Sequence, residues 1–394
     1  MTSLERVIID TIRSVVGEGT IGLHEPIIGD EEREAVDACL RSGYVSSVGE
    51  WVVAFEKSLC DVTGAKYAVA MSSGTSALQI ALLAAGVKPG DEVIVPAMSF
   101  VATASAVRHM GAIPHFVDIS TDTLGLDPDS LREHLSDSMR MTASGLENPI
   151  TGNHIKAVVP MHCFGHPIDM PRLLEVAQEY SLMVIEDAAE GLGSLLGDKH
   201  VGTFVRAGVL SFNGNKIVTT GGGGAVITDD EKLAKKARHL STTAKVPHPW
   251  EFEHDEVGFN YRMPNINAAL GVAQLSKLDE FVKAKRTLAN AYADAFAGID
   301  GVSIFSEPKG ATSNYWLDSL ILDDGVVNER DTIIEKAQEE GLQLRPAWKL
   351  LPELGPYRHH PQGTLFVAKN LQPRILNIPS SAFLGPVGRQ RPVS

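Results

Sequence analysis

Short apolar stretches alternate with amphipathic ones through the first half of the chain. Mostly apolar residues occupy positions 67–71, 92–95, 113–117, 155–159 and 182–185, and residues with helical spacing lie between most of these stretches. Short, continuous apolar runs of this kind are typical of strands that are buried on both faces. The alternation therefore predicts a mainly parallel sheet that is covered by helices on both sides.

The periodicity changes on either side of this alternation. Between Leu4 and Val15, apolar residues at helical spacing predict an amphipathic helix that docks on the body of the protein or on a partner subunit. Residues 137–153 are polar and contain Gly and Pro, which predicts a surface insertion. From Asn265 to Phe296, one apolar seam predicts a single long helix that leads into a second domain. Strand–helix alternation then resumes toward the C-terminus.

These patterns predict an α/β protein in three parts. We expect an N-terminal helix or arm over residues 1–29, a large domain over residues 30–264 and a smaller α+β domain over residues 265–394. Ligands of open parallel sheets bind at the carboxyl ends of the strands. The large domain is therefore the place to look for chemistry.

Composition excludes several classes of partner. The 394 residues include 35 basic and 49 acidic ones, which gives a net charge of −14. Nucleic-acid binding needs clustered Lys and Arg, so we expect no nucleic-acid partner. The chain also lacks the roughly 20 continuous apolar residues of a membrane span, so we expect no membrane partner.

The cysteines and histidines indicate neither disulfides nor a metal site. Cys39, Cys60 and Cys163 are far apart, odd in number and without CxxC spacing. This usage fits a reducing compartment and predicts a cytoplasmic protein without a disulfide framework. The thirteen histidines form no HExxH motif, and we expect no metal.

Polar residues follow three of the predicted strands. These stretches are Ser72–Ser76, Glu186–Glu190 and Ser211–Lys216. They are far apart in the sequence, but the carboxyl ends of parallel strands meet at one edge of a sheet. We therefore expect the three stretches to converge on one crevice.

Each stretch taken alone also has an ordinary interpretation. The turn at Ser73-Gly74 opens a helix whose N-terminus suits a phosphate group, although Ser and Thr also cap ordinary helices. Asp187 ends a buried strand and needs a cation or hydrogen-bond donor, which a salt bridge or a protonated pyridine nitrogen would supply. Lys216 precedes four glycines, but most lysines are solvated surface charges.

Together these residues are the parts that pyridoxal 5′-phosphate requires. A lysine forms a Schiff base with this cofactor, and an aspartate keeps its ring nitrogen protonated so that the ring acts as an electron sink. Phe100 begins a helix where an aromatic residue could cover the ring, and Ser211 could add a phosphate contact. No GxxxxGK[ST] occurs, and no GxGxxG follows a strand. A P-loop nucleotidase and a nucleotide-sugar dehydrogenase would both lack their main phosphate-binding element.

The chain resembles the DegT/DnrJ/EryC1/StrS sugar aminotransferases, a family of fold-type-I pyridoxal-phosphate enzymes, from about Gly22 to Pro379. The resemblance implies an α/β fold whose large domain has a mainly parallel seven-stranded sheet. The segments that carry it are SSGTSAL at 72–78, PAMSFVATASAVRHMGAIPHFVDI at 96–119, IEDAAEGLGS at 185–194, SFNGNKIVTTGGGG at 211–224 and GFNYRMPNINAALG at 258–271.

The family pattern implies a role for each matching residue. Lys216 is expected to carry the Schiff base and to shuttle the proton, and Asp187 to pair with the pyridine nitrogen. Glu190 stands where many members carry Gln or His, and we expect it near the ring. Asn260 is expected to reach the cofactor phosphate of the neighbouring subunit, which implies a homodimer with shared active sites. The remaining expected cofactor contacts are Gly74, Thr75, Ser76, Phe100 and Ser211.

The resemblance also indicates the reaction. In the dehydrating branch of the family a histidine replaces the lysine, so Lys216 favours transamination. Four segments are similar to the branch that acts on UDP-linked 4-keto-6-deoxy-N-acetylhexosamines in the biosynthesis of legionaminic and related nine-carbon acids or of bacillosamine. We therefore expect L-glutamate to donate an amino group to C4 of such a nucleotide sugar. The segments are LHEPIIG at 23–29, GYVSSVGEWV at 43–52, PMHCFGHPID at 160–169 and TTAKVPHPWEFEHDEVGFNYR at 242–262.

Alternatives remain open at this point. The perosamine branch has a segment like EDAAEGLGS, so GDP-4-keto-6-deoxymannose is an alternative acceptor. A pyridoxal-phosphate lyase, decarboxylase or dehydratase would share the fold. A regulator of this fold would need a DNA-binding segment, for which the first 30 residues are too short and too acidic. The candidate substrate contacts are Ser46, His162, His248 and Arg345.

Overall fold

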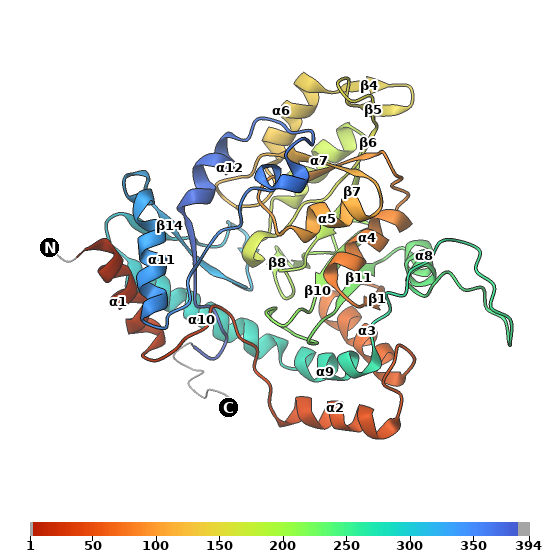
Figure 1. The fold of residues 1–394 in the computed structure, drawn as a ribbon, viewed down its shortest axis with the longest axis horizontal. Coiled ribbons are helices and arrows are strands. Elements are labelled where there is room, and N and C mark those ends of the chain that lie inside the picture. The colour runs from red at the N-terminus through yellow and green to blue at the C-terminus, as the bar shows by residue number, and fades with distance from the viewer. Residues whose placement is uncertain (1–2, 385–394) are drawn as a thin grey trace.

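A seven-stranded sheet forms the centre of the molecule (Figure 1). The computed structural model describes residues 3–384. The strand order is β1-β11-β10-β7-β6-β2-β3, and neighbouring strands are parallel except at β11, which is antiparallel to β1 and β10. This confirms the expected mainly parallel sheet. The strands are β1 (Tyr67–Met71), β2 (Glu92–Pro96), β3 (Ile113–Val117), β6 (Ile155–Val158), β7 (Met183–Asp187), β10 (Ala207–Ser211) and β11 (Gly224–Thr228).

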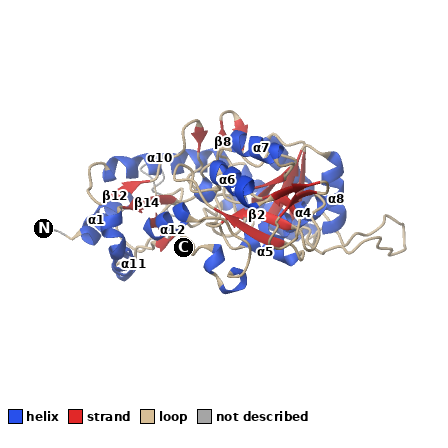
Figure 2. Ribbon diagram, turned by 90° about the horizontal axis from the view of Figure 1, so that it is seen from above, coloured by secondary structure: helices blue, strands red, loops and turns tan. Residues whose placement is uncertain are grey.

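Helices cover both faces of this sheet (Figure 2). In strand β1, Val69 and Met71 pack into one core cluster, whereas Ala68 and Ala70 pack into another on the opposite face. Side chains that alternate in this way are buried on both sides, which explains the continuous apolar runs of the sequence. One face carries α4 (Gly74–Ala84), α5 (Ala102–His109) and α8 (Glu231–Ser241), and the other carries α3 (Glu50–Thr63), α6 (Pro128–Ser138) and α7 (Met170–Glu179).

A second, antiparallel sheet lies in the C-terminal part. Its strand order is β12-β14-β16-β15, with β12 (Val302–Ile304), β14 (Asp318–Leu322), β16 (Ile375–Ile378) and β15 (Arg345–Pro346). Three helices share its core, and they are α1 (Leu4–Val16), α10 (Leu278–Phe296) and α11 (Arg330–Glu339). The N-terminal helix therefore docks on the C-terminal elements of its own chain (Figure 1). The division of the chain at residues 29 and 264 stays a prediction.

The predicted long helix after residue 264 is two helices. Helix α9 spans Asn265–Leu275, and α10 begins at Leu278. The break allows α9 to pack beside α2 (Asp30–Ser42) and α3, while α10 runs on to the second sheet. Lys277 lies at the break, and its Nζ is 2.9 Å from Oε1 of Glu32 on α2. The expectation of one continuous helix was wrong because the apolar seam continues across the break.

The shorter elements lie around these two sheets. The predicted polar insertion contains an antiparallel hairpin, β4 (Arg140–Thr142) and β5 (Gly145–Glu147). A small three-stranded sheet joins β13 (Ala311–Thr312), β8 (Leu195–Leu196) and β9 (Lys199–His200). Helix α12 spans Phe366–Leu371, and short 3₁₀ helices cover Cys163–Gly165, Asp324–Glu329, Leu351–Glu353, Gly355–Tyr357 and Gln372–Arg374.

Two expectations from the sequence concern membrane spans and disulfides. Within residues 3–384, no helix is both long and apolar enough to cross a membrane. The three cysteines are free thiols. The cytoplasmic location that their number suggested stays a prediction.

Candidate active site

A cavity of about 330 Å³ lies at the carboxyl edge of the seven-stranded sheet. Residues that follow β1, β2, β7 and β10 line it, so the three polar stretches of the sequence do converge. Seven of the expected cofactor contacts are among the lining residues, and these are Gly74, Thr75, Phe100, Asp187, Glu190, Ser211 and Lys216.

The N-terminus of α4 forms one end of the cavity. Ser73 caps this helix, because its Oγ accepts a hydrogen bond from the N–H of Ser76 over 3.1 Å. The Oγ of Ser76 in turn accepts from the N–H of Ser73 over 3.1 Å. Gly74 and Thr75 supply the first-turn N–H groups that have no intrahelical acceptor, at the positive end of the helix dipole. Ser76 belongs to this cap and is not among the residues that line the cavity, so its expected cofactor contact stays a prediction.

Two glycines bring separate strands close to this helix end. A Cβ on Gly74 would lie 2.9 Å from Cβ of Ser211, and a Cβ on Gly224 would lie 2.4 Å from the carbonyl carbon of Ser73. Any larger residue would therefore push α4 away from β10 and β11. The Ser211 hydroxyl and the free N–H groups of α4 together make a cradle of donors that suits a phosphate group.

Asp187 is the last residue of β7 and is 5% exposed. Its Oδ2 accepts a hydrogen bond from the Thr103 hydroxyl over 2.8 Å, and its Oδ1 accepts from the N–H of Ala189 over 3.2 Å. Burial raises the pKa of Asp187, and the two hydrogen bonds together with the charge of Lys216 oppose that rise. A cationic N–H group in the cavity would stabilise the ionised carboxylate, as a protonated pyridine nitrogen does.

Lys216 follows β10 and is 9% exposed. Its Nζ lies 3.0 Å from Oε1 of Glu190 and 3.7 Å from the centroid of the Trp316 ring. The indole Nε1–H of Trp316 donates to the carbonyl oxygen of Asn215 over 2.7 Å. A carboxylate and an aromatic face therefore hold the amine of Lys216 at the cavity.

Glu190 is 3% exposed and has a second donor besides Lys216. Its Oε2 accepts from the N–H of Phe164 over 2.9 Å. Burial raises the pKa of Glu190 to about 7, against the opposing effects of Lys216 and of the Phe164 N–H. This carboxyl group is therefore able to change its protonation state near neutral pH.

The lining residues that the sequence did not predict include Thr103, Trp316 and Trp348. Thr103 lies one turn after Phe100, within the segment that the resemblance assigned to the ring. Its place in that segment was therefore a sequence signal that could have identified it. Trp316 and Trp348 come from the C-terminal part and line the cavity from the opposite side. The Phe100 and Trp348 rings lie 6.1 Å apart, and Phe100 is 48% exposed. Phe100 thus has an open face beside the cavity.

His162 lies in the core and not in the cavity lining, and its expected substrate contact stays a prediction. Its side chain is fully buried, and its Nε2 lies 2.8 Å from Oε1 of Glu186. Its Nδ1 accepts the N–H of Ile168 over 3.2 Å. Both ring nitrogens are thus engaged inside the core, and His162 holds the end of β6 to its neighbours.

The other expected contacts also lie outside the cavity lining. Ser46 is exposed, and its carbonyl oxygen accepts from the N–H of Asn265 over 2.7 Å. Arg345 is exposed on β15, and His248 lies on the projecting loop between α8 and α9. Asn260 is exposed as well and does not line the cavity of its own chain, so its expected contact in a partner subunit stays a prediction.

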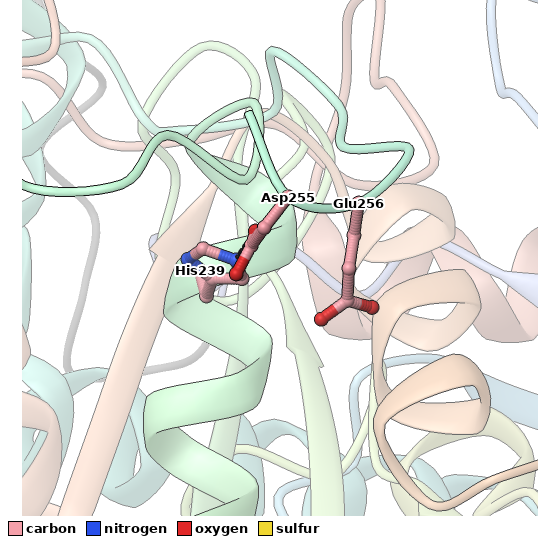
Figure 3. A group of neighbouring side chains, drawn as sticks. All are labelled: His239, Asp255 and Glu256. Atoms are coloured by element: carbon pink, nitrogen blue, oxygen red, sulfur yellow. Dashed lines mark hydrogen bonds and ion pairs between the residues drawn. The ribbon is translucent and has the colours of Figure 1, made fainter. Parts of the chain in front are cut away.

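One cluster has the composition of a metal site. His239, Asp255 and Glu256 lie together at the base of the projecting loop (Figure 3). Asp255 is turned toward His239, and its Oδ1 is 2.6 Å from Nε2 of that histidine. Glu256 forms an ion pair with Lys236. These side chains already have partners, and the cluster carries no metal assignment.

The cavity therefore fits pyridoxal 5′-phosphate. The α4 cradle would hold the phosphate, Asp187 the ring nitrogen and Lys216 the carbonyl carbon, with Phe100 beside the ring. When bound, this cofactor supplies an electron sink for bonds broken at a substrate carbon. The parallel sheet and this set of residues at its carboxyl edge define a pyridoxal-phosphate enzyme of fold type I.

Comparison with known proteins gives the family. The chain belongs to the DegT/DnrJ/EryC1/StrS aminotransferase family, whose sequence profile matches residues 26–387. It is 36% identical over 367 residues to GDP-perosamine synthase of Caulobacter vibrioides, covering 92% of this chain and 94% of that one. The protein is thus an aminotransferase that uses pyridoxal 5′-phosphate.

Solved structures agree with this membership. The aminotransferase TlmJ from Streptoalloteichus hindustanus superposes with a TM-score of 0.83 at 29% identity, covering 92% of this chain and 94% of TlmJ. Spr1654 from Streptococcus pneumoniae, solved in its PLP form, superposes with a TM-score of 0.80 at 25% identity. That match covers 92% of this chain and 94% of Spr1654.

Proposed function

We propose that this protein transfers the amino group of L-glutamate to C4 of a nucleotide-linked 4-keto-6-deoxy sugar. The acceptor that we favour is UDP-4-keto-6-deoxy-N-acetylhexosamine, in surface-glycan or nonulosonic-acid biosynthesis. The observation that carries the proposal is the buried amine of Lys216, 3.0 Å from Glu190 and beside Asp187 in one cavity. A lyase, decarboxylase or dehydratase on this fold would need no amino acceptor, and the lysine favours transamination over dehydration.

The side chains of the cavity divide the work of the reaction. Lys216 holds the cofactor and, when free, its Nζ moves the proton that leaves the α-carbon of the donor. General-base catalysis of this kind contributes roughly 10²- to 10⁴-fold. Asp187 would stabilise a positive charge on the ring nitrogen, and Trp316 and Trp348 would limit the access of water to the cavity that they line. The α4 cradle fixes the phosphate and thereby the position of the ring.

We propose a homodimer in which Asn260 serves the cofactor of the partner subunit. Supporting this, large apolar side chains are exposed on α2, α3 and the loop between them, where Tyr44 is 65% exposed and Val48 73% exposed. Exposed apolar patches are typical of protein–protein contacts. The loop between α8 and α9 also projects far from the body (Figure 1) and exposes Trp250. A fully active monomer in sedimentation and activity measurements would contradict this assembly.

A second acceptor has support from a relative. The Caulobacter vibrioides protein is named GDP-perosamine synthase, and it aligns over 92% of this chain. GDP-4-keto-6-deoxymannose is therefore the second candidate. The two candidates differ in the nucleotide and in the substituent at C2 of the sugar, so a direct substrate comparison separates them.

The test uses purified protein with a panel of UDP- and GDP-linked 4-keto sugars and L-glutamate. We expect an amino sugar from the UDP-linked N-acetylhexosamine, identified by product mass, with the configuration at C4 read by NMR. Glutamate alone should bleach the visible absorption of the lysine-bound cofactor, and no bleaching would reject transamination. Lys216→Ala should lose turnover but still bind the cofactor, while the exposed Lys88→Ala control should behave like the wild type.

A further inference from the structure

Glu92 is a buried carboxylate with several donors around it. Glu92 is fully buried, and it accepts hydrogen bonds from His115, Asn148 and Thr151. Burial alone would raise the pKa of Glu92, but these hydrogen bonds outweigh burial and lower it. Glu92 is thus a structural carboxylate that stays ionised.

Glu190 is equally buried but has fewer donors. Within the described chain, its side-chain oxygens have two hydrogen-bond partners, the amine of Lys216 and the N–H of Phe164. Two donors compensate less of the desolvation cost of a carboxylate than the larger set around Glu92 does. The smaller donor set around Glu190 therefore leaves its carboxylate better able to take up a proton than that of Glu92.

The fold fixes the carboxyl group of Glu190 at the amine. Phe164, which donates to Oε2, has a left-handed backbone with φ of 55° and ψ of 18°. A bulky residue in this region is strained and persists only where the surrounding structure enforces it. The Trp316 ring beside the amine offers no proton acceptor, because an indole N–H is a donor only, and it donates to the carbonyl oxygen of Asn215. Glu190 is therefore the acceptor to which Lys216 can pass a proton.

We propose that Glu190 is a catalytic residue that accepts the proton of the Lys216 ammonium and returns it. The proton leaves Nζ for Oε1, which converts an ammonium and a carboxylate into a neutral amine and a neutral carboxylic acid without a change in net charge. The neutral amine has the lone pair that bonds to a carbonyl carbon and that removes a proton from the donor's α-carbon. This inference rests on the proposed role of Lys216.

The other ionisable groups near the pair set its charge. Asp187 lies across the cavity, and its negative charge raises the pKa of Glu190 further. Cys163 lies beside Glu190, and burial raises the pKa of its thiol well above the ordinary value, so it stays neutral. Burial lowers the pKa of His24, which lies behind Trp316, so this histidine is neutral as well. The pair therefore gains its extra proton on Glu190 as the pH falls.

The pH dependence follows from these charges. Above the pKa of Glu190 at about 7, its carboxylate is available to accept the proton of Lys216. Below that pKa, the carboxyl group holds a proton of its own and no longer serves as the acceptor. The rate at which Lys216 bonds to pyridoxal 5′-phosphate should then fall by about tenfold for each pH unit.

The test compares full-length wild-type, Glu190→Gln and Glu190→Asp proteins that have been freed of cofactor and checked by circular dichroism. Pyridoxal 5′-phosphate is added between pH 5.5 and 9, and the visible absorption of the linked form is followed. We expect a plateau above about pH 7 for the wild type. For Glu190→Gln, the change of slope near pH 7, called the break below, should be lost. Its rate of cofactor linkage should be at least about tenfold lower at that pH and should keep rising toward pH 9. Glu190→Asp should restore the break.

Two further measurements make the assignment specific. Infrared difference spectra across pH 7 should show a carboxylic-acid C=O band in the wild type that is missing in Glu190→Gln. Cys163→Ser should keep the break near pH 7. A wild-type profile in Glu190→Gln, or loss of the break in Cys163→Ser, would overturn the proposal. These measurements involve neither glutamate nor a sugar, so their result is independent of whether the proposed transamination holds.

Discussion

Trp316 ties the C-terminal part of the chain to the catalytic loop through a single hydrogen bond, from its Nε1–H to the carbonyl oxygen of Asn215 over 2.7 Å. Asn215 directly precedes Lys216, whose amine lies over the same indole ring. Asn314 strengthens the link, because its Oδ1 accepts from the N–H of Trp316 and its Nδ2 donates to the carbonyl oxygen of Glu190. Residues about 100 positions apart in the sequence thus fix the lysine and its carboxylate together.

This relationship predicts graded effects of substitutions at Trp316. Trp316→Phe keeps an aromatic face but loses the N–H donor, which is worth about 1 kcal/mol, so we expect about a fivefold slower reaction with glutamate. Trp316→Leu also loses the cation–π contact of about 1 kcal/mol, which predicts roughly a thirtyfold loss. Stopped-flow bleaching of the bound cofactor by glutamate measures both. Equal rates in the two variants would show that the aromatic face does not contribute to the rate, and the exposed Phe366→Leu serves as the control.

Thr103 should control the acidity of Asp187. Its hydroxyl donates to Oδ2 of Asp187 over 2.8 Å, and this hydrogen bond opposes the rise in the pKa of Asp187 that burial causes. A hydrogen bond to a charged group is worth about 1.5–3 kcal/mol, so Thr103→Val should raise that pKa by about one unit or more. The acidic limb of the pH–activity profile should move to higher pH accordingly. Ser99→Ala removes the 2.7 Å contact to Thr103 and should shift the limb less.

The parallel sheet made much of this site predictable from the sequence. Because parallel strands end at one edge, the polar residues after β1, β7 and β10 had to meet there. The order of apolar runs therefore led to Asp187 and Lys216 without knowledge of the loops between them. Strand β11 was missed, since it begins inside the glycine run that looks like a loop. Only the packing shows that Gly224 must be small beside Ser73.

The residues that were missed or misplaced depend on contacts between distant segments. No local pattern marks Trp316 as a neighbour of Lys216, because 99 positions of intervening chain must fold before they meet. His162 follows a strand end, and a polar residue there suggests a ligand contact. The partner that keeps it in the core, Glu186, lies on the neighbouring strand β7. Its role therefore depends on strand order, which the local sequence does not specify.

Gly74 and Ser211 should show strong coupling in cofactor binding. A Cβ at residue 74 would lie 2.9 Å from Cβ of Ser211, which is too close for either backbone to stay in place. Overpacking typically costs about 1–3 kcal/mol, so Gly74→Ala should raise the Kd for pyridoxal 5′-phosphate by about 5- to 150-fold. Ser211→Gly should weaken binding through the lost hydroxyl. The loss of binding free energy in the double variant should be smaller than the sum of the two single losses, because the clash is gone. Simple additivity would contradict this account.

His166 should make the protein sensitive to acid. It is fully buried against Phe305 and Tyr315, with ring centroids 4.9 and 5.2 Å away, and its nitrogens have no hydrogen-bond partner within the described residues. Burial lowers the pKa of His166 from 6.5 to about 3. The folded state therefore favours the neutral ring. The contribution of His166 to the stability of the fold is complete above pH 6.5 and is lost as the pH falls toward 3. In that window the unfolded chain binds one proton that the folded chain excludes, which lowers the free energy of unfolding by about 1.4 kcal/mol per pH unit. Denaturant unfolding at several pH values gives the slope of the free energy of unfolding against pH. His166→Phe should remove this contribution from that slope, whereas His109→Gln, at an exposed site, should leave it unchanged.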